Sequence, residues 1–451
     1  MKKNTFIKKY INKKMAAAVV ATAVCMSVPI ILAVQNWDDH DRSNRYLVLN
    51  TAKAYLDSCE PNAILFCNGD NDTFPLWYVQ EVEGYRTDVR ICNLSLMGMD
   101  WYIDLLKRKA YDGKPAPITM TKDLYQSGTR DWFEAINRIK EPQNIKNVMQ
   151  EICKPANNKR NAIITTINFY MEVDKEKVLA NGTVPAAMAD KIVDRIVWKL
   201  PNDAIAYENG RDTAIVMTKA YIAMLDILAN NNWERPIYFV ATTGGEAFFG
   251  LENYFQCEGM AHRLVPVYQD DQWAKILVGG VNTDVLYDRI MTKFDFSQYA
   301  DPKIFLSEDF TRMASNVKLS FFRLAEALAR ENKIDSMEAV LDRYHKWFPA
   351  SVIPYNGIDY SCMGSIYPSC ETPAAIEKGI FYYNEYVEQL LKEITYYRKF
   401  KGKKSEIVSH ELSRSIDNLR ELNYICKQYL QYIDEKYKPQ LEGVVKKMEG
   451  Y

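Results

Sequence analysis

The sequence predicts an α/β protein with one transmembrane helix at its amino end, a doubly wound, Rossmann-like sheet in the middle and a helical region at its carboxyl end. Three observations support this order. A long apolar stretch lies near the start, strand–loop–helix–strand patterns occur twice in the first part of the chain, and strand patterns vanish from about residue 283. We therefore divide the chain into segments 1–14, 15–34, 36–282 and 283–451.

The overall composition is that of a folded protein. Of the 451 residues, 48% are hydrophobic and 25% are charged, and the length allows two or three domains. The formal net charge is -1, and no basic patch interleaved with aromatic residues stands out. We therefore expect no nucleic-acid partner.

The amino end has the pattern of a membrane anchor. Residues 1–14 carry six lysines and no acid, and Met15–Val34 follows as twenty residues without a charge. Twenty helical residues are about 30 Å long, enough to cross a hydrocarbon core. A signal peptide is the alternative, but its apolar core usually has only about 7–15 residues before a cleavage site. We expect an uncleaved single-pass anchor in the inner membrane, with its amino end cytoplasmic and the bulk of the chain periplasmic.

A polar juxtamembrane cluster follows the anchor. Trp37 is expected at the membrane interface, and a helix is predicted over residues 45–59. Between them, charged side chains are suited to bind a divalent ion or a polar lipid headgroup, although their spacing matches no established metal pattern. The alternative is a solvated segment before the helix. The cluster consists of Asp38, Asp39, His40, Asp41 and Arg42.

The first strand–loop–helix–strand pattern contains the first candidate ligand site. Ala63–Cys67 is an apolar run typical of a buried strand, and Arg90–Leu96 is a second one. Between them a helix is predicted, with Pro75 in its first turn. Loops at the carboxyl ends of parallel strands are where ligands bind. The candidate residues in this loop are Asn68, Asp70, Asn71, Asp72 and Thr73.

Two interpretations of these carboxylates stay open. Paired carboxylates at a strand end can serve as a general base and a metal ligand. Alternatively, Asp72 or Thr73 caps the following helix. A calcium-binding EF-hand loop is excluded because Phe74 stands where the third ligand should be. We assign no metal ligand set, and a divalent cation is the one cofactor considered.

The middle of the chain is assigned mainly from apolar periodicity. Helices are predicted at Arg130–Ile139, Ala186–Val197 and Thr213–Asn232, and a strand is predicted at Ala162–Phe169.

A second strand–loop–helix–strand pattern follows. It comprises a strand at Arg235–Val240, a helix reaching Phe255 and a last strand at His262–Val267. Neither loop contains a nucleotide-binding glycine motif or a P-loop. The loop before the helix is suited either to present backbone N–H groups to an anion or to form a tight turn. Its candidate residues are Gly244, Gly245 and Glu246.

The carboxyl-terminal segment is predicted to be entirely helical. A helix pair over residues 310–332 and 336–348 has apolar positions close to those of 34-residue tetratricopeptide repeats. Long helices follow to the end. Such a region is suited to bind partner proteins.

Three long runs carry a family resemblance. They are Asn36–Ser43 (NWDDHDRS), Asn68–Trp77 (NGDNDTFPLW) and Leu225–Ile237 (LDILANNNWERPI). Together they resemble the extracytoplasmic, carboxyl-terminal half of large bacterial multi-span membrane proteins with an amino-terminal domain of unknown function. That family is similar to GT-C protein O-mannosyltransferases. The resemblance covers the chain from about Met15 onward.

The resemblance implies a glycosyltransferase system whose catalytic carboxylates lie in the multi-span half. This chain has one span, so no catalytic residue is carried over. We expect an anchored accessory or substrate-handling part, working with a separate multi-span subunit and not catalytic by itself. The alternatives are a self-contained metal-dependent hydrolase or transferase using Asp70, Asp72 and Glu246, and a protein-interaction scaffold.

Overall fold

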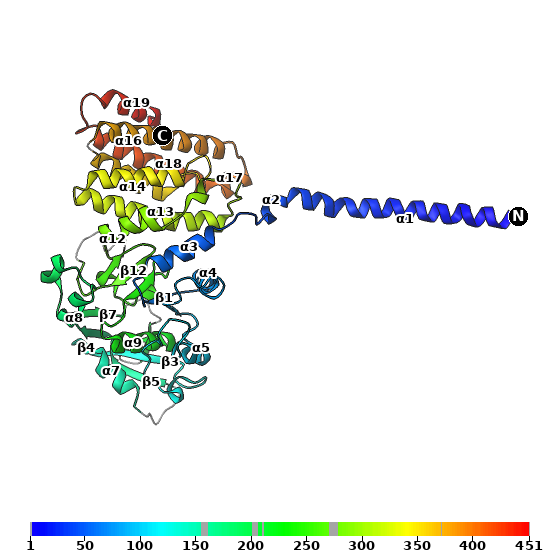
Figure 1. The fold of residues 1–451 in the computed structure, drawn as a ribbon. Helices are drawn as coiled ribbons and strands as arrows, with labels where there is room; N and C mark the ends of the chain where they lie inside the picture. Colours follow the sequence, from blue (N-terminus) through cyan, green and yellow to red (C-terminus); the bar gives the residue numbers. More distant parts are fainter. Residues whose placement is uncertain are drawn as a thin grey trace.

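The computed structural model shows a projecting amino-terminal helix, an α/β part and a helical part (Figure 1). The structure describes residues 2–154, 161–200, 206–209, 212–269, 278–370 and 372–450.

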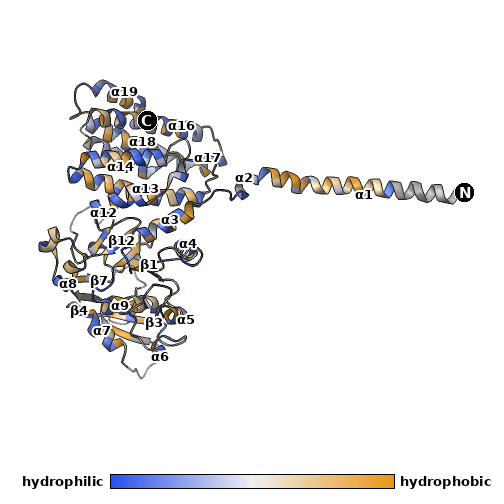
Figure 2. Ribbon diagram, viewed as in Figure 1, coloured by the Kyte–Doolittle hydropathy of each residue, from blue (hydrophilic) through white to orange (hydrophobic). Residues whose placement is uncertain are grey.

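Helix α1 (Lys2–Gln35) projects from the rest of the molecule. Its segment Lys13–Gln35 is, among the described residues, the one helix long and apolar enough to cross a membrane, and none of its apolar window is buried in the protein. Figure 2 shows most of this segment in the hydrophobic colours, with blue at its lysine end. Length and composition therefore suggest membrane anchoring at the amino end.

The segment that leaves the anchor is attached to the helical part. It contains helix α2 (Trp37–His40) and leads into helix α3 (Leu47–Asp57), which confirms the helix predicted there. The side chain of Gln298 accepts from the Tyr46 amide at 3.0 Å and donates to the Asn44 carbonyl at 3.1 Å. These two bonds link the exit segment to residues far along the chain.

The first predicted strand–loop–helix–strand unit is confirmed. It comprises β1 (Ile64–Cys67), α4 (Asp70–Glu81) and β2 (Arg90–Asn93). Strand β1 lies between β2 and β10 (Ile237–Val240) and is parallel to both. All four β1 side chains are fully buried, which explains the unbroken apolar run in the sequence.

The other half of this six-stranded sheet departs from the expected parallel arrangement. Its order is β13-β11-β12-β10-β1-β2, and β12 is antiparallel to both of its neighbours. The sheet is therefore mixed. The outer strands are β11 (Phe255–Cys257), β12 (Ala261–Leu264) and β13 (Gly280–Val281).

The prediction of a helix that reaches Phe255 is wrong. Helix α10 (Gly245–Phe248) makes one turn, and a 3-10 turn η2 (Glu252–Tyr254) leads into β11. Gly250 ends the helix with φ +83°, and a Cβ there would lie 2.2 Å from the Lys199 carbonyl oxygen. The close approach of another backbone therefore terminates the helix.

The chain between β2 and β10 adds two smaller sheets, with orders β5-β3-β9-β8 and β4-β6-β7. Several helices accompany them, of which α9 packs beneath the main sheet (Figure 1). The elements are α5 (Asp100–Leu106), α6 (Lys122–Tyr125), β3 (Trp132–Ile139), β4 (Gln143–Asn144), α7 (Ile145–Ile152), β5 (Asn161–Thr166), β6 (Asn168–Glu172), α8 (Lys175–Ala180), η1 (Ala186–Lys191), β7 (Arg195–Lys199), β8 (Ala206–Asn209), β9 (Asp212–Thr218) and α9 (Lys219–Asn231).

Two predictions in this region are wrong and two are confirmed only in part. The predicted helix at Arg130–Ile139 is strand β3, and that at Ala186–Val197 is a 3-10 turn followed by β7. Burial alternates along β7, which is the strand period of two. The helix predicted from Thr213 begins at Lys219 because β9 precedes it, and the strand predicted at Ala162–Phe169 is divided between β5 and β6.

The helical part confirms the predicted helix pair as α13 (Glu308–Arg330) and α14 (Ile334–Trp347). Among the described residues, no strand follows β13. The remaining elements are α12 (Thr283–Asp288), η3 (Arg289–Lys293), η4 (Ser297–Ala300), η5 (Asp359–Met363), α15 (Gly364–Ile366), η6 (Tyr367–Ser369), α16 (Pro373–Tyr397), α17 (Lys403–Ile407), α18 (Ser409–Tyr429) and α19 (Lys438–Met448).

The sheet separates two hydrophobic cores. Leu65 and Cys67 face a core that continues into the helical part through Phe321 of α13, whereas Ile64 and Phe66 face the core shared with α9. The helical part therefore packs directly on one face of the sheet.

Candidate functional site

Three parallel strands end at the same edge of the main sheet, and polar side chains gather there. Strands β10, β1 and β2 run in one direction, so the loops that follow them are neighbours. Asn68 follows β1, Thr242 comes shortly after β10, and Ser95 follows β2. We call this region the carboxyl edge, and it is the place where the sequence predicts a ligand site.

On the β10 side, three segments converge on the carboxylate of Asp72. The Thr242 hydroxyl donates to Asp72 Oδ2 at 2.7 Å, and the Tyr55 hydroxyl from α3 donates to Asp72 Oδ1 at 3.2 Å. The two hydroxyl oxygens lie 3.3 Å apart. Asp72 therefore links α4, α3 and the loop after β10, and it is not a helix cap.

Burial changes the acid–base properties of this cluster. Loss of contact with water raises the pKa of Asp72, although the two hydrogen bonds it accepts oppose the shift. Burial also raises the pKa of Tyr55 well above its usual range, and the nearby Asp72 carboxylate adds to the effect. A carboxyl with a raised pKa is suited to exchange protons nearer to neutral pH.

On the β2 side, Thr73 joins the two strands. Its hydroxyl donates to the Gly69 carbonyl at 2.6 Å and accepts from Asn93 Nδ2 at 2.7 Å. The Ser95 hydroxyl donates to Asn68 Oδ1 at 2.7 Å. Thr73 is fully buried, so its role is to hold α4 against β1 and β2.

The remaining candidates in this loop face solvent. Asp70 and Asn71 are exposed in the first turn of α4, which begins after Gly69 rather than at Asp72 or Thr73. The side chain of Glu246 lies outside the described residues. Within the described part of the chain, no group of three or more His, Cys, Asp or Glu side chains is arranged to hold a metal ion.

The glycine loop after β10 forms a turn. Gly244 has φ +88°, and its carbonyl accepts from the Ala247 amide at 3.2 Å. Both Gly244 and Gly245 are exposed, and the helix that follows has only four residues. This geometry favours the tight-turn interpretation over the anion site.

The juxtamembrane cluster is divided between helix α2 and an open cavity. The His40 ring is 2.9 Å from the Asn36 carbonyl, and Asp41 accepts from the Ser43 amide at 2.8 Å. The side chains of Asp38 and Asp39 lie outside the described residues. The cavity has a volume of about 270 Å³ and is lined by Asp41, Ser43, Arg45, Pro302, Lys303 and Phe305. Arg42 of the predicted cluster is exposed beside it along the chain.

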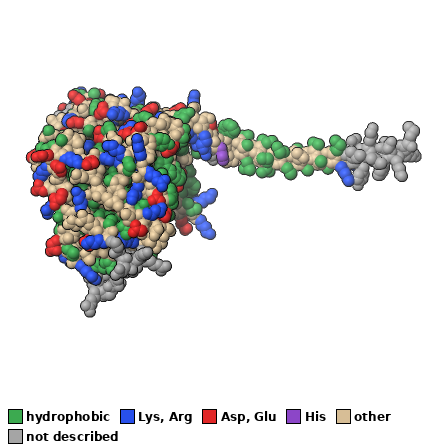
Figure 3. Space-filling view, turned by 60° about the horizontal axis from the view of Figure 1, so that its bottom comes forward, with side chains coloured by type: hydrophobic (Ala, Val, Ile, Leu, Met, Phe, Trp, Pro, Cys, Tyr) green, Lys and Arg blue, Asp and Glu red, His purple; other side chains and the backbone are tan. Residues whose placement is uncertain are grey.

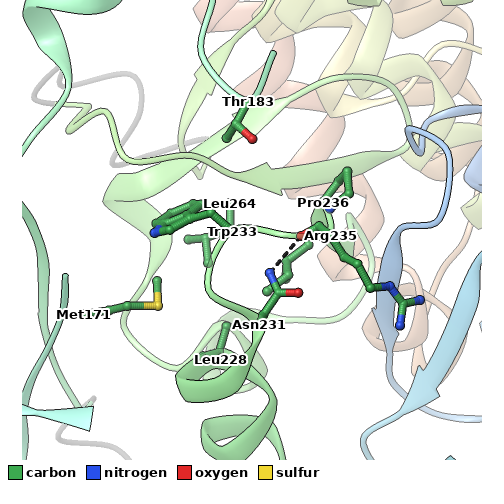
Figure 4. A pocket seen from close by; sticks show the side chains of 9 residues that line it. Met171, Thr183, Leu228, Asn231, Trp233, Arg235, Pro236 and Leu264 are labelled. Carbon is green, nitrogen blue, oxygen red and sulfur yellow. Dashed lines mark hydrogen bonds between the residues drawn. The ribbon is translucent and has the colours of Figure 1, made fainter. Parts of the chain in front are cut away.

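A smaller pocket lies at the opposite end of β10 (Figure 4). Apolar side chains including Leu228, Trp233 and Leu264 surround it, and Asn231 donates to the Arg235 carbonyl at 2.8 Å. The Arg235 side chain turns away toward backbone carbonyls, including that of Asn62 at 2.7 Å. The free volume of this pocket is about 10 Å³, which leaves room for one water molecule at most. This pocket therefore belongs to the scaffold.

The sequence did not single out Tyr55, Thr242, Asn93 or Ser95 as site residues. Asn93 and Ser95 carried a usable signal, because polar residues directly after a buried strand lie at the same edge as Asn68. Tyr55 carried none, since it is one of the buried residues of α3, the helix before β1, and such residues are expected to pack in the core.

Comparison with known proteins places this edge within a family domain. No curated protein and no solved structure matches the chain. Residues 48–285 match the family described as TMEM260-associated domain 2, which is associated with membrane proteins. This range contains the whole carboxyl edge and more than half of the 451 residues. The chain belongs to the TMEM260-associated domain 2 family.

Proposed function

We propose that this chain is the membrane-anchored, extracytoplasmic accessory part of a GT-C-like glycosyltransferase system, and that it handles substrate for a separate multi-span catalytic subunit. The observation that carries the proposal is the direct succession of an apolar helix long enough to span a membrane and a domain of the TMEM260-associated family. The resemblance of three sequence runs to protein O-mannosyltransferase-like membrane proteins supplies the reaction class.

The positions of those runs support this division of roles. Asn36–Ser43 lies where the chain leaves the anchor, and Asn68–Trp77 contains the carboxyl edge. In Leu225–Ile237, polar side chains serve the scaffold, since Asp226 accepts from the amides of Thr119 at 2.7 Å and Met120 at 3.0 Å. The first two runs therefore supply the groups closest to the anchor and to the carboxyl edge.

A transfer assay in membranes tests the proposal. Membranes of source cells with and without the chain are supplied with a lipid-linked radiolabelled sugar, and label on protein is counted. We expect transfer to fall without the chain and to return when the full chain is supplied. Transfer by the purified chain alone would contradict an accessory role, and so would undiminished transfer in membranes that lack it.

We also propose that the anchor lies in the inner membrane with residues 1–14 cytoplasmic. The lysines of this segment support it through the positive-inside rule. Protease added to spheroplasts is expected to digest the domain that follows Gln35, and protection of that domain would reverse the topology. The doubly wound character of the sheet and the tetratricopeptide-like character of the helical part remain proposals of the same kind.

Asp72 favours a second candidate, a self-contained enzyme that uses a divalent cation. Its half-buried, hydrogen-bonded carboxyl lies at the edge where ligands of such sheets bind, two residues after the exposed Asp70. Melting temperatures with divalent ions and activated sugars test this candidate on the intact chain and on an Asp70→Asn/Asp72→Asn variant. A ligand that stabilises the intact chain alone would support it, and the absence of any shift would leave only the accessory role.

A further inference from the structure

Helix α4 has two apolar faces, of which only one is covered. Leu76 and Val79 are fully buried against the core. Three other apolar residues recur every four positions along α4 and at its carboxyl end. They are Phe74, which is 57% exposed, Tyr78, which is 51% exposed, and Val82, which is 66% exposed. Residues at this spacing lie on one side of a helix. The second apolar face therefore meets solvent in the isolated chain.

Helix α5 extends this face. Aromatic contacts run from Phe74 to Trp77, with ring centroids 5.7 Å apart, from Trp77 to Tyr102 at 6.4 Å, and from Tyr102 to Trp101 at 5.5 Å. The Tyr111 hydroxyl bonds to the Glu81 carboxylate on α4. We define the α4–α5 face as the exposed residues Phe74, Tyr78, Val82, Met99, Trp101, Leu105 and Tyr111.

This face lies on the side of the molecule from which the anchor projects. Figure 1 shows α4 and α5 on that side, and Figure 3 shows hydrophobic side chains gathered at the margin next to the anchor. Two contacts fix the loop that follows α4 to α3, the first long helix after the anchor. They are the Lys53–Glu83 ion pair at 2.7 Å and the bond from the Tyr85 hydroxyl to Asp57 at 2.6 Å.

The chemistry of the α4–α5 face is that of a membrane interface. Three of its seven members are Trp or Tyr, which combine an apolar ring with a polar tip, and the exposed cations Arg108 and Lys109 follow α5 directly. Of the acids near it, Glu81 on α4 bonds to Tyr111 and Glu83 in the following loop pairs with Lys53, whereas Asp70, four residues before Phe74, is exposed at the edge of the face. Contiguous exposed apolar surface of this kind marks interaction sites.

We propose that the α4–α5 face rests on the phospholipid surface of the membrane that holds the anchor. The tether makes this docking an intramolecular step, so a modest apolar surface suffices. Because α4 and α5 follow β1 and β2, docking holds the carboxyl edge close to the lipid headgroups. The inference requires that α1 spans a membrane and does not depend on the glycosyltransferase role.

Photo-crosslinking of the full chain in nanodiscs tests the proposal. The discs contain phosphatidylcholine, phosphatidylglycerol and a phosphatidylcholine that carries a diazirine near its glycerol, and adducts are mapped by mass spectrometry. We expect adducts on peptides that contain residues 74–82 and 99–111 as well as on the anchor. The peptide with Phe381, 57% exposed like Phe74, serves as the internal control and should stay unlabelled.

A matched pair of variants shows whether labelling requires docking of the α4–α5 face or only exposed apolar side chains. Phe74→Gln/Tyr78→Gln/Val82→Gln should lower labelling of α5 more than about tenfold, since burying even one such side chain contributes roughly that factor. Phe381→Gln/Tyr424→Gln/Tyr432→Gln, at similarly exposed positions of the helical part, should leave it unchanged. Both variants should melt near the parent because the substituted side chains are exposed.

Two results would overturn the proposal. The first is adducts confined to the anchor in the intact chain, which would leave a protein partner as the occupant of this face. The second is equal labelling of the α4–α5 face and the Phe381 peptide, which would show contact with lipid irrespective of orientation.

Discussion

At the scale of single residues, Asp72 is the group whose protonation is tied most directly to the candidate site. Burial raises its pKa, so the folded chain holds this proton at pH values where the unfolded chain, with a pKa near 3.8, has lost it. The stabilisation is fully present below pH 3.8 and is lost as the pH rises through the folded pKa.

Asp72→Asn is therefore expected to remove the decrease in unfolding free energy that accompanies the rise in pH. The free energy of unfolding of the parent, measured with denaturant from pH 4 upward, should fall relative to that of the variant, by at most about 1.4 kcal/mol per pH unit. A constant difference between the two proteins across this range would mean that Asp72 titrates like a solvated carboxyl.

His262 makes the opposite contribution to pH dependence. It lies 97% buried on β12 between the rings of Phe248 and Phe255, and burial holds its pKa well below 6.5, with the nearby Arg323 cation adding to the effect. The unfolded chain takes up the proton first as the pH falls below 6.5. Stability is therefore complete above that pH and declines below it.

Replacing His262 with Phe should reduce the loss of stability on acidification. Between pH 7 and pH 5.5 the parent should lose up to about 1.4 kcal/mol per pH unit more than the variant, measured by denaturant unfolding. A His262→Phe profile parallel to that of the parent would contradict the assignment.

The candidate site shows how far single residues can be predicted from sequence. The loop Asn68–Thr73 was predicted because an apolar strand, a polar turn and a helix follow each other there. The separate structural roles of the residues within this loop were not predictable. Thr73 and Asp72 differ because one meets Asn93 and the other meets Tyr55, and these contacts depend on segments that only the fold brings together.

At the scale of elements, patterns that are buried on both sides were predicted well and alternating patterns were not. Strand β1 is an unbroken apolar run, whereas β7 alternates between buried and exposed side chains and β3 mixes the two without strict alternation. Short alternating segments with polar positions also fit an amphipathic helix. Their pairing with β9 and β6, distant in sequence, decided the outcome.

Gly250 offers a test of why the helix after β10 stops. Gly250→Ala places a methyl group 2.2 Å from the Lys199 carbonyl oxygen at φ +83°, whereas Gly244→Ala at φ +88° meets nothing within 4 Å. We expect Gly244→Ala to cost about 1–2 kcal/mol of unfolding free energy from the backbone conformation alone. Gly250→Ala should cost about 1–3 kcal/mol more because two backbones must separate. Equal costs for the two variants would mean that the backbones at Gly250 and Lys199 separate without a loss of unfolding free energy.

At the scale of the whole molecule, the sheet and the helical part are joined by buried polar contacts as well as by the shared core. Arg289 pairs with Glu258 at 3.3 Å and with Glu60 at 2.9 Å. Arg323 of α13 donates to the carbonyl of Gly279 at 3.0 Å. Each of these contacts crosses from helices of the carboxyl-terminal segment to loops of the α/β part. We therefore expect the two parts to unfold in one transition.

Substitution of Lys318 in α13 tests whether the sheet and the helical part are coupled in unfolding. Its ammonium and the Asp359 carboxylate are both fully buried and lie 3.0 Å apart, and the Asn356 amide also donates to Asp359 at 2.7 Å. Lys318→Met leaves the carboxylate buried without its counter-ion, which typically costs about 3–5 kcal/mol. In Lys318→Met/Asp359→Asn, the amide oxygen still accepts from Asn356 and no charge is left unpaired, so most of the loss should be recovered.

Hydrogen exchange then reports whether the damage stays local. Because Phe321, one turn from Lys318, packs in the same core as Leu65 of β1, amides of β1 should lose protection in Lys318→Met by the same free energy as amides of α13. The double variant should restore protection in both elements. Loss of protection in α13 with β1 unchanged would mean that the helical part opens independently of the sheet, in spite of the core that they share.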